Sequence, residues 1–524
     1  MSRGGANARA GAGASDLSAP NQQSPNPKHA MRNFFDAIAD IANAQRAAVA
    51  FETPDGISLR FQDLLEHSAR FAGALDELGV RPGDRVLVQV EKSLPVVPLY
   101  LAVLRLGAVY LPLNSGYTDN EVSYFIGDAG PRAALTESSR VESTGVLLGE
   151  RGVALSMDDL ERRATTARAF DGVIPRTGAD AAAIVYTSGT TGRSKGAVLT
   201  HHNLESNART LVSAWGFTRA DVLVHALPVY HVHGLFVALH CALLSGARTV
   251  FLPRFDTTSV VHALSSATVF MGVPTYYTRL LNADGFPPRE NRVRLYVSGS
   301  APLRPETFAA FEARTGQRIL ERYGMSEAGM ITSNPLHGER RAGAVGRPLS
   351  GIDVRVRGAD GELAGADRPG VLEIRGPNVF AGYWRNPDKT AESFTADGWF
   401  VTGDVATIGP DGVVTIVGRE KDLIISGGLN VYPKEIEDEI DALEGVRESA
   451  VIGVPHPDFG EAVVAVIDAA GATLDEGVCV NALRTRLAGF KVPKRFLFVD
   501  ELPRNAMGKV QKKALRERFG GLFV

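Results

Sequence analysis

A chain of 524 residues is too long for a single hydrophobic core, so two or more domains are expected. The hydrophobic content of 44%, the charged content of 22% and the net charge of −3 are ordinary for a globular protein and give no electrostatic indication of a nucleic-acid binder. The chain has no run of about 18 or more apolar residues, which argues against membrane insertion.

The N-terminal segment is rich in Gly, Ala, Ser, Asn and Pro and lacks the continuous apolar stretch of a secretory signal. Arg3, Arg9 and Arg32, with little acid around them, match the composition of an organellar transit peptide, but no amphipathic pattern accompanies them. Residues 1–30 are therefore expected to form a disordered tail. Cys241 and Cys479 lie far apart in apolar surroundings, which favours buried thiols and a cytoplasmic location.

From Met31 onward, helical and short apolar segments alternate. The first of these are a helix over Phe61–Leu78, a strand over Asp84–Val90, a helix over Ser93–Leu106 and a strand over Ala108–Leu113. The rhythm continues with strands at Asp180–Tyr186, Ala197–Thr200, Asp221–Ala226, Thr249–Leu252 and Ala267–Met271, and with a helix that begins at His201–Leu204. Alternation of this kind predicts a parallel, doubly wound sheet.

The pattern changes at about Gly351 to short strands broken by Gly, Asp and Pro, such as Gly370–Arg375 and Val413–Val417. A boundary is predicted at Gly418–Lys421, and the remaining residues indicate a small α+β unit with a helix and then a strand. The expected fold class is therefore α/β: a large N-terminal domain (31–419) of doubly wound, mostly parallel sheets plus a β-rich subdomain, followed by a small α+β C-terminal domain (420–524).

The stretch Tyr186–Gly196 reads YTSGTTGRSKG and is the most specific local signal in the chain. Its glycines allow backbone N–H groups to face an anion, and its hydroxyls and Lys195 add donors, so a polyphosphate ligand is indicated. Two residues separate Gly192 from Lys195, which excludes the Walker loop, and no G-x-G-x-x-G opens a helix, so a nicotinamide cofactor has no support. Composition alone leaves an exposed turn equally open, but the flanking buried elements favour a binding loop.

This stretch resembles the phosphate-binding motif of the adenylate-forming superfamily, which contains acyl-CoA synthetases, luciferases and peptide-synthetase adenylation domains. Further motifs of that superfamily follow in its order: Glu321–Glu327 (ERYGMSE), Thr402–Asp404, Gly418–Arg419 and Leu502–Lys509 (LPRNAMGK). The resemblance covers roughly residues 32 to 518. It implies ATP, Mg²⁺ and coenzyme A as cosubstrates and cofactor, and a C-terminal domain that is mobile.

The resemblance also implies a set of nucleotide-binding residues. They are Thr187, Ser188, Gly189, Thr190, Thr191, Gly192 and Lys195 of the loop, Ser298, Gly299, Ser300 and Ala301 of an adenine turn, Tyr323, Gly324, Met325 and Ser326, and Asp404 and Arg419 for the ribose. Glu327 and Thr187 are the implied metal ligands, since Mg²⁺ prefers carboxylate and phosphate oxygens.

Attack of a carboxylate on the α-phosphate of ATP brings two anions together, so positive charge is required there. By resemblance Lys509 supplies it, although a further cation of a basic tail is the alternative reading. Lys421 matches the superfamily's hinge, about which the small domain rotates after adenylation. Ser426, Gly427 and Gly428 match the face that then admits the pantetheine arm of coenzyme A.

The acyl pocket is predicted less sharply. By resemblance His231 lies beside the acyl carboxylate together with Met325, although a core histidine remains open and no ligand set supports a metal pair with His233. Arg294 is expected to pair with the second carboxylate of a dicarboxylic acid, because a guanidinium binds carboxylates bidentately. Arg340 is a second candidate for that anion, and Arg341 competes with it.

Two long segments, His225–Phe236 and Lys421–Glu437, resemble malonyl-CoA synthetases. The expected activity is therefore ATP-dependent conversion of malonate to malonyl-CoA through malonyl-adenylate, with release of AMP and pyrophosphate. Val232 departs from a small polar residue of some members and leaves methylmalonate open. Alternatives are an aryl- or medium-chain acyl-CoA ligase, a carrier-loading adenylation domain and a luciferase-like oxygenase.

Overall fold

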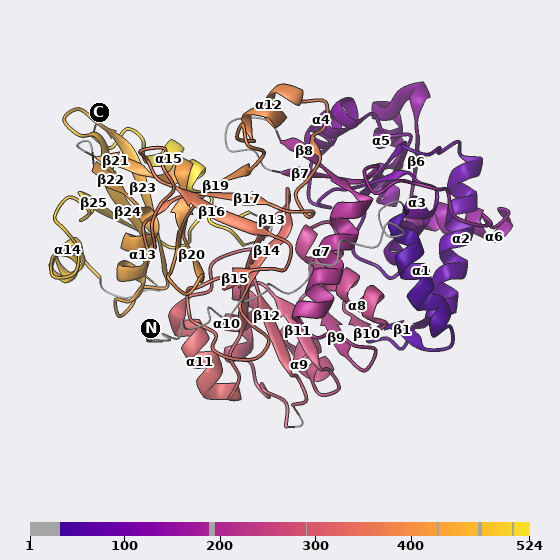
Figure 1. Ribbon diagram of the computed structural model, residues 1–524, viewed down its shortest axis with the longest axis horizontal. Coiled ribbons are helices and arrows are strands. Elements are labelled where there is room, and N and C mark those ends of the chain that lie inside the picture. Colours follow the sequence, from indigo (N-terminus) through magenta and orange to yellow (C-terminus); the bar gives the residue numbers. More distant parts are fainter. Residues whose placement is uncertain are drawn as a thin grey trace, which may run out of the picture.

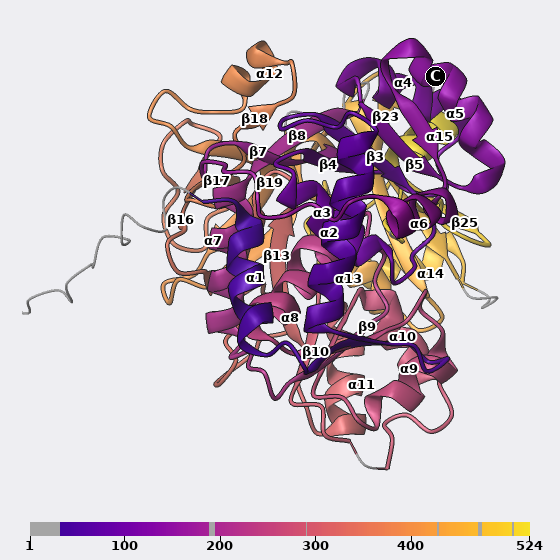
Figure 2. The same ribbon diagram turned by 90° about the vertical axis from the view of Figure 1, so that its right-hand side faces the viewer.

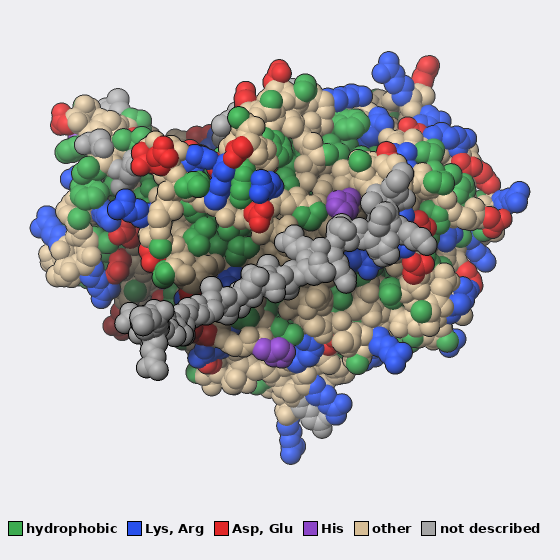
Figure 3. All heavy atoms as spheres, in the orientation of Figure 1, with side chains coloured by type: hydrophobic (Ala, Val, Ile, Leu, Met, Phe, Trp, Pro, Cys, Tyr) green, Lys and Arg blue, Asp and Glu red, His purple; other side chains and the backbone are tan. Residues whose placement is uncertain are grey.

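The computed structural model describes residues 32–187, 194–289, 291–426, 429–469, 474–505 and 508–523. The predicted tail, residues 1–30, lies outside this part of the chain. Among the described residues, no helix has both the length and the apolar character needed to cross a bilayer. On the face drawn in Figure 3, Lys/Arg and Asp/Glu side chains are interspersed, in keeping with the small net charge.

The first sheet has seven strands in the order β18-β8-β7-β4-β3-β5-β6. Pairing is parallel from β7 to β6 and antiparallel for β8 and β18. The strands are β3 (Arg85–Gln89), β4 (Val109–Pro112), β5 (Ala133–Thr136), β6 (Val153–Leu155), β7 (Ala181–Thr187), β8 (Lys195–Thr200) and β18 (Gly382–Tyr383). Their order confirms the predicted mostly parallel, doubly wound arrangement.

The second sheet has nine strands in the order β15-β14-β13-β12-β11-β9-β10-β1-β2, parallel from β13 to β1 and antiparallel at both ends. The strands are β1 (Val49–Glu52), β2 (Ser58–Arg60), β9 (Val222–His225), β10 (Arg248–Phe251), β11 (Val269–Gly272), β12 (Leu295–Ser298), β13 (Leu320–Met325), β14 (Gly329–Ser333) and β15 (Arg347–Pro348).

Helices cover both faces of these sheets (Figure 1; Figure 2). The largest hydrophobic cluster joins residues of both sheets to α1 (Phe34–Ala44), α2 (Phe61–Glu77), α3 (Val96–Arg105), α7 (His201–Ala214) and α8 (His240–Ser245). The seven-stranded sheet packs its other face on α4 (Asp119–Ala129) and α5 (Val141–Leu148), and the nine-stranded sheet packs its other face on α9 (Thr257–Leu264), α10 (Pro274–Leu281) and α11 (Pro305–Thr315). A further helix, α6 (Met157–Thr166), packs on α2.

Strand alternation explains this layering. In β3, Val86 and Val88 belong to the central cluster, whereas Leu87 between them belongs to the cluster under α4 and α5. In β9, Leu223 and Val224 divide in the same way. Because successive side chains of a strand point to opposite faces, apolar residues at consecutive positions bury both faces of each sheet.

A third sheet is antiparallel, with the order β16-β17-β19-β20, and it accounts for the predicted β-rich part. Its strands are β16 (Asp353–Arg357), β17 (Gly370–Arg375), β19 (Phe400–Ile408) and β20 (Val414–Arg419). A short helix, α12 (Pro387–Glu392), precedes β19.

Residues beyond β20 form a separate α+β unit, drawn in yellow at the left of Figure 1. A 3₁₀ turn at Glu420–Asp422 leads into a five-stranded sheet of β21 (Ile424–Ser426), β22 (Leu429–Val431), β23 (Glu448–His456), β24 (Gly460–Asp468) and β25 (Arg495–Val499). One face packs on α13 (Pro433–Asp441) and α14 (Glu476–Arg484), and the other on α15 (Lys512–Phe519). Residues 420–524 are called the lid below, and residues 32–419 the body.

Candidate active site

Three residues from three strands meet at one corner of the body. The Tyr323 hydroxyl, on β13, donates to Asp404 Oδ2 at 2.5 Å, and Arg419 Nε lies 2.7 Å from Asp404 Oδ1. Asp404 and Arg419 face each other across the β19–β20 ladder, so the register of two antiparallel strands sets their pairing. The carboxylate of Asp404 is almost completely buried and already oriented by two donors. This is the corner at which the sequence predicts ribose binding.

A second group lies around Glu327, directly after β13. Glu327 is buried, its Oε1 accepts a hydrogen bond from the Tyr383 hydroxyl at 3.1 Å, and burial raises the pKa of its carboxyl. The Lys195 ammonium lies 5.6 Å from the centre of the Tyr383 ring, and Lys195 pairs with Thr187 at the loop end of the β7–β8 hairpin. The predicted metal ligands Glu327 and Thr187 are thus brought to the same side of the site as Lys195.

The predicted adenine turn follows β12. Ser300 has φ of +73°, a left-handed conformation that non-glycine residues rarely adopt, and its hydroxyl lies 3.2 Å from His233 Nδ1. A Cβ atom on Gly299 would lie only 2.3 Å from the guanidinium carbon of Arg322, so a larger residue there would displace this guanidinium. Ala301 completes the turn, and Ser298 at its start is fully buried.

Gly324, Met325 and Ser326 continue the Tyr323 strand toward Glu327. Gly324 also has no room for a side chain, since a Cβ would lie 2.2 Å from the Gly329 carbonyl oxygen. Met325 ends β13 and is partly buried against the central core.

The lid carries Lys509 to the site. Burial, together with the nearby cations Arg419 and Lys421, lowers the pKa of Lys509 to about 8, while Asp404 opposes the shift. As a whole residue, Lys509 is nevertheless exposed to solvent. Its neighbour Gly508 approaches Thr275 of the body, with a hypothetical Cβ 3.8 Å from the threonine methyl. The sequence-distant motifs at Asp404, Arg419 and Lys509 therefore come together.

His231 lies on the segment that leads into a π-helix, His233–Leu239. Burial lowers the pKa of His231 to about 4, and the cations of Arg322 and Lys509 act in the same direction. His231 is therefore a neutral imidazole at pH 7 in the unliganded protein, able to donate or accept a hydrogen bond but not to supply a charge. The backbone N–H of His233 donates to its Nδ1 atom at 3.3 Å.

Arg322, on β13 between Glu321 and Tyr323, was not singled out from the sequence. Arg322 is only 3% exposed, and its Nε and Nη2 atoms are buried without a hydrogen-bond partner in the described part of the chain. It lies close enough to His231 and His233 to lower the pKa of both. A charged residue inside a buried strand was the available signal, since an unpaired buried cation is costly.

Arg294 and Arg340 do not reach this group. Arg294 precedes β12, whereas the adenine turn follows that strand, so about four residues or roughly 13 Å of strand separate them. The Arg294 guanidinium forms a two-point ion pair with Asp221, with both N–O distances 2.8 Å, and donates to the carbonyls of Trp215 and Gly216.

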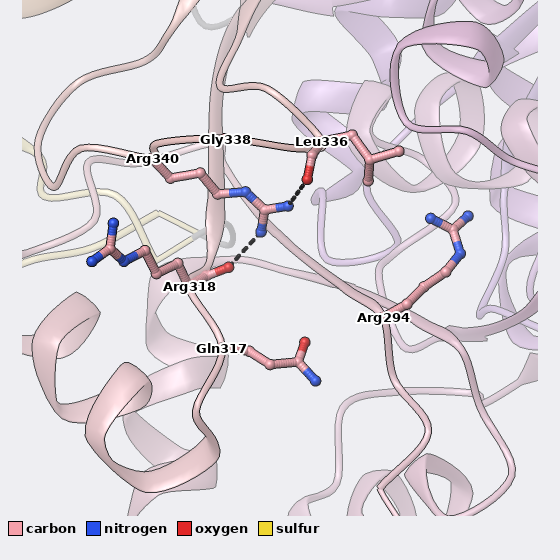
Figure 4. Close-up of a pocket in the computed structure, with 6 residues that line it drawn as sticks. All are labelled: Arg294, Gln317, Arg318, Leu336, Gly338 and Arg340. Atoms are coloured by element: carbon pink, nitrogen blue, oxygen red, sulfur yellow. Dashed lines mark hydrogen bonds between the residues drawn. The ribbon is translucent and has the colours of Figure 1, made fainter.

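Arg294 and Arg340 line a surface pocket at that opposite edge of the sheet (Figure 4), with a volume of about 330 Å³. Arg340 donates to the carbonyls of Arg318, Pro335 and Leu336, which fixes a turn. The guanidinium of Arg294 points away from that of Arg340, so the two do not converge on a common anion. Arg341 pairs with Asp411 instead. These contacts argue against Arg294 and Arg340 as substrate residues.

The remaining predicted residues divide into two groups. Lys421 lies in the 3₁₀ turn between body and lid, and Ser426 ends β21 in the lid. Ser188, Gly189, Thr190, Thr191, Gly192, Gly427 and Gly428 lie outside the described residues.

A half-buried lysine, Lys92, contacts the region that carries His231 and was not predicted from the sequence. Lys92 Nζ lies 2.8 Å from both the Nδ1 atom and the carbonyl oxygen of His225, and the His225 Nε2 atom lies 3.0 Å from the Gly234 carbonyl oxygen. This chain of contacts joins the seven-stranded sheet to the start of the π-helix. It anchors the segment that carries His231.

Two family descriptions match the chain: AMP-binding enzyme over residues 38–384, and AMP-binding enzyme C-terminal domain over residues 435–509. A malonate–CoA ligase of Arabidopsis thaliana is 35% identical over 480 residues, covering 84% of this chain and 78% of that protein. A feruloyl-CoA synthase of Amycolatopsis sp. is 36% identical over 475 residues, covering 89% and 95%.

Among solved structures, the ATP-bound crystal structure of MatB from Rhodopseudomonas palustris is 47% identical, covers 94% of this chain and 99% of its own, and superposes with a TM-score of 0.91. The resemblance to adenylate-forming enzymes is confirmed, together with the expected large first domain and smaller second one. The chain therefore belongs to the AMP-binding enzyme family.

Proposed function

We propose that this protein is an AMP-forming malonate–CoA ligase that converts malonate, ATP and coenzyme A to malonyl-CoA, AMP and pyrophosphate. The observation that carries the choice of acid is Arg322. A buried guanidinium with two unpartnered nitrogen atoms calls for an anion, and the free carboxylate of malonyl-adenylate supplies one. A monocarboxylic acid, once activated, would leave this charge unpaired.

Each half of the reaction has its own residues in this proposal. During adenylation, Lys509 neutralises charge between the malonate carboxylate and the α-phosphate, and His231 donates a hydrogen bond to the reacting carboxylate. Asp404, oriented by Tyr323 and Arg419, accepts hydrogen bonds from the ribose hydroxyls. Afterwards the lid turns about Lys421, and the thiolate of coenzyme A attacks the acyl-adenylate carbonyl so that AMP leaves.

Glu327 and Thr187 are proposed to hold Mg²⁺. The described residues contain no group of three or more His, Cys, Asp or Glu side chains that could hold a metal. One carboxylate and one hydroxyl still suit Mg²⁺, which keeps several waters and binds mainly through substrate phosphates. The raised pKa of the Glu327 carboxyl reflects a buried anion without a full cation partner, which fits a metal site. The ion would neutralise charge on the departing pyrophosphate.

Relatives named malonate–CoA ligases, at 35–36% identity, and the ATP-bound neighbour agree with this proposal. Relatives of comparable identity are named feruloyl-CoA synthase and long-chain-fatty-acid–CoA ligase, so family membership alone does not choose the acid. The boundary at residues 419/420 and a cytoplasmic location, supported by the free buried thiols of Cys241 and Cys479, are part of the same proposal.

The test is pyrophosphate release over a panel of malonate, methylmalonate, succinate, acetate, octanoate and ferulate, each with ATP, Mg²⁺ and coenzyme A. We expect malonate to give the highest kcat/KM and the monocarboxylic acids to be poor by at least about 100-fold, the cost of leaving a buried cation unpaired. Preferred turnover of octanoate or ferulate, with malonate inactive, would refute the proposal.

A further inference from the structure

Arg304 lies four residues beyond Ser300, at the N-cap of α11, and its side chain reaches out of the body. The guanidinium donates to two main-chain carbonyls of the lid: Nη2 to Asp441 at 2.7 Å, and Nη1 to Arg447. Within its own helix it lies 3.4 Å from Glu306, an ion pair through Nε. A cation of the body therefore binds directly to lid backbone.

The position of these acceptors explains the contact. Asp441 is the last residue of α13, and the final carbonyls of a helix have no partner within the helix. A cation at this end also opposes the negative pole of the helix dipole. The last turn of α13 contains no basic residue of its own. The body thus supplies the cap that the lid helix lacks.

The carboxylate of Asp441 adds to the contact. Arg304 Nε lies 3.9 Å from its Oδ2, and the Asp441 side chain is only 9% exposed. Burial raises the pKa of Asp441 to about 6, while Arg304 and Lys434 oppose the rise. The Arg304 Nε atom is buried and makes no hydrogen bond within the described part of the chain. The Nε atom therefore contacts the carboxylates of Glu306 and Asp441 only as longer ion pairs.

The backbone directly before Arg304 is hydrogen-bonded to β13, the strand that carries Tyr323. The N–H of Leu303 donates to Glu321 Oε1 at 3.1 Å, and Glu321 is buried directly before Arg322 on β13. Lys434 of the lid lies close enough to oppose the burial that raises the pKa of Glu321 to about 7. The segment from Ser300 to Arg304 therefore connects the adenine turn at one end with the lid at the other.

We propose that Arg304 is a positioning residue that holds the lid in the arrangement that places Lys509 at the α-phosphate. It thereby favours the adenylation half-reaction over thioester formation. This inference rests on the proposed function, since it assigns the two half-reactions to two lid positions. Arg304 touches no substrate, and it acts through the lid backbone.

The test compares Arg304→Met, which keeps the apolar stem, with Arg304→Lys and a matched control, Arg318→Met. Arg318 pairs with Glu312 of α11 at 2.7 Å and makes no hydrogen bond or ion pair with the described residues of the lid. Adenylation is measured as single-turnover AMP formation without coenzyme A, and thioester formation is measured from preformed malonyl-adenylate and coenzyme A.

For Arg304→Met we expect adenylation to fall roughly tenfold, the weight of one charge-assisted hydrogen bond, with thioester formation unchanged or faster. Arg304→Lys restores part of the rate, because an ammonium can bind one of the two carbonyls. Arg318→Met leaves both rates unchanged. An equal fall of both half-reactions in Arg304→Met, as a purely structural role would give, overturns the proposal.

A second readout needs no substrate. Hydrogen exchange of the amides in α13 and in the linker 420–423 is compared between the unliganded wild type, Arg304→Met and Arg318→Met. Faster exchange in Arg304→Met alone, with the body unchanged, supports the contact, and equal exchange in all three contradicts it. If the wild type fails to activate malonate, the proposed function fails while this measurement still decides the role of Arg304.

Discussion

Lys509 shows how a single residue combines position with charge. Burial and its cationic neighbours lower its pKa to about 8, so the charged form predominates in the unliganded protein at pH 7. The cation is the low-pH form, and it is the form that neutralises the phosphates. Adenylation is therefore expected to weaken as the pH rises through 8.

The first prediction follows for kcat/KM of adenylation with respect to ATP, which reports the free enzyme. It should fall with an apparent pKa near 8, and Lys509→Arg should remove that fall while keeping some activity, since arginine stays charged. Lys509→Ala should lose adenylation but still convert preformed malonyl-adenylate with coenzyme A. A pH profile identical in wild type and Lys509→Arg would contradict the assignment of this pKa.

Arg322 and Arg294 show what a sequence reveals about a charged residue and what it hides. Arg294 stands next to the adenine motif in sequence, but strand direction carries it to the far edge, where Asp221 already pairs with it. Arg322 sits inside a recognised motif, yet its orphaned nitrogen atoms become visible only when neighbouring strands are placed. Residue type and motif predicted that an arginine binds the second carboxylate of the dicarboxylic acid, but they did not identify which arginine.

The second prediction separates the two arginines. Arg322→Gln should lower kcat/KM for malonate by at least about 100-fold, because a buried charge-to-charge contact is lost, while acetate activity changes little. Arg294→Gln should leave malonate kinetics nearly unchanged and lower stability by roughly 1–3 kcal/mol, because Asp221 loses its partner. The measurements are the steady-state kinetics of each variant with malonate and with acetate, and the denaturant unfolding of each variant. Loss of malonate activity in Arg294→Gln alone would restore the original interpretation.

At the scale of elements, hydrophobic pattern was a reliable guide. Every strand expected before residue 300 is present, with ends shifted by one or two residues, because apolar runs bounded by Gly and Asp are buried on both faces. The helix expected from Ser93 begins instead at Val96, after Pro95, which cannot donate a helical hydrogen bond.

The π-helix at His233–Leu239 could not be predicted from the hydrophobic pattern. Its segment is apolar after His233, so periodicity does not distinguish it from an ordinary buried helix. What fixes its start is the contact of Lys92 with His225, between residues 133 positions apart, and of His225 with Gly234. A lone lysine next to a predicted strand gives no sign of such a partner. The segment around His231 was therefore located by its motif, but the contacts that hold it in place were not predicted.

For the whole molecule, the sequence indicated two bodies of unequal size and the position of the link between them. It could not indicate how the lid rests on the body. Arg304 binds main-chain carbonyls, which every residue possesses, so no side-chain pattern marks the partner. Contacts of this kind decide which lid arrangement is stable, and through Lys509 they decide which half-reaction the protein is prepared for.

The third prediction concerns the link itself. Lys421 lies in a 3₁₀ turn between β20 and β21, a conformation whose φ is close to the value that proline imposes. Lys421→Pro should therefore restrict rotation about this residue, at the cost of some strain in Glu420, which lies in the same turn and would precede the proline. We expect adenylation to stay within a few-fold of the wild type and thioester formation to fall by more than tenfold, the reverse of Arg304→Met.

Glu420→Pro is the matched control, because Arg419 before it is extended, with φ of −113° and ψ of 138°, as a residue preceding proline prefers. It stiffens the same turn but leaves Lys421 free to rotate, so both half-reactions should persist. The measurement is the same pair of single-turnover assays, with far-ultraviolet circular dichroism to confirm folding. If Lys421→Pro forms thioester at the wild-type rate, the rotation occurs elsewhere. If Glu420→Pro also blocks it, the whole turn rather than Lys421 is the hinge.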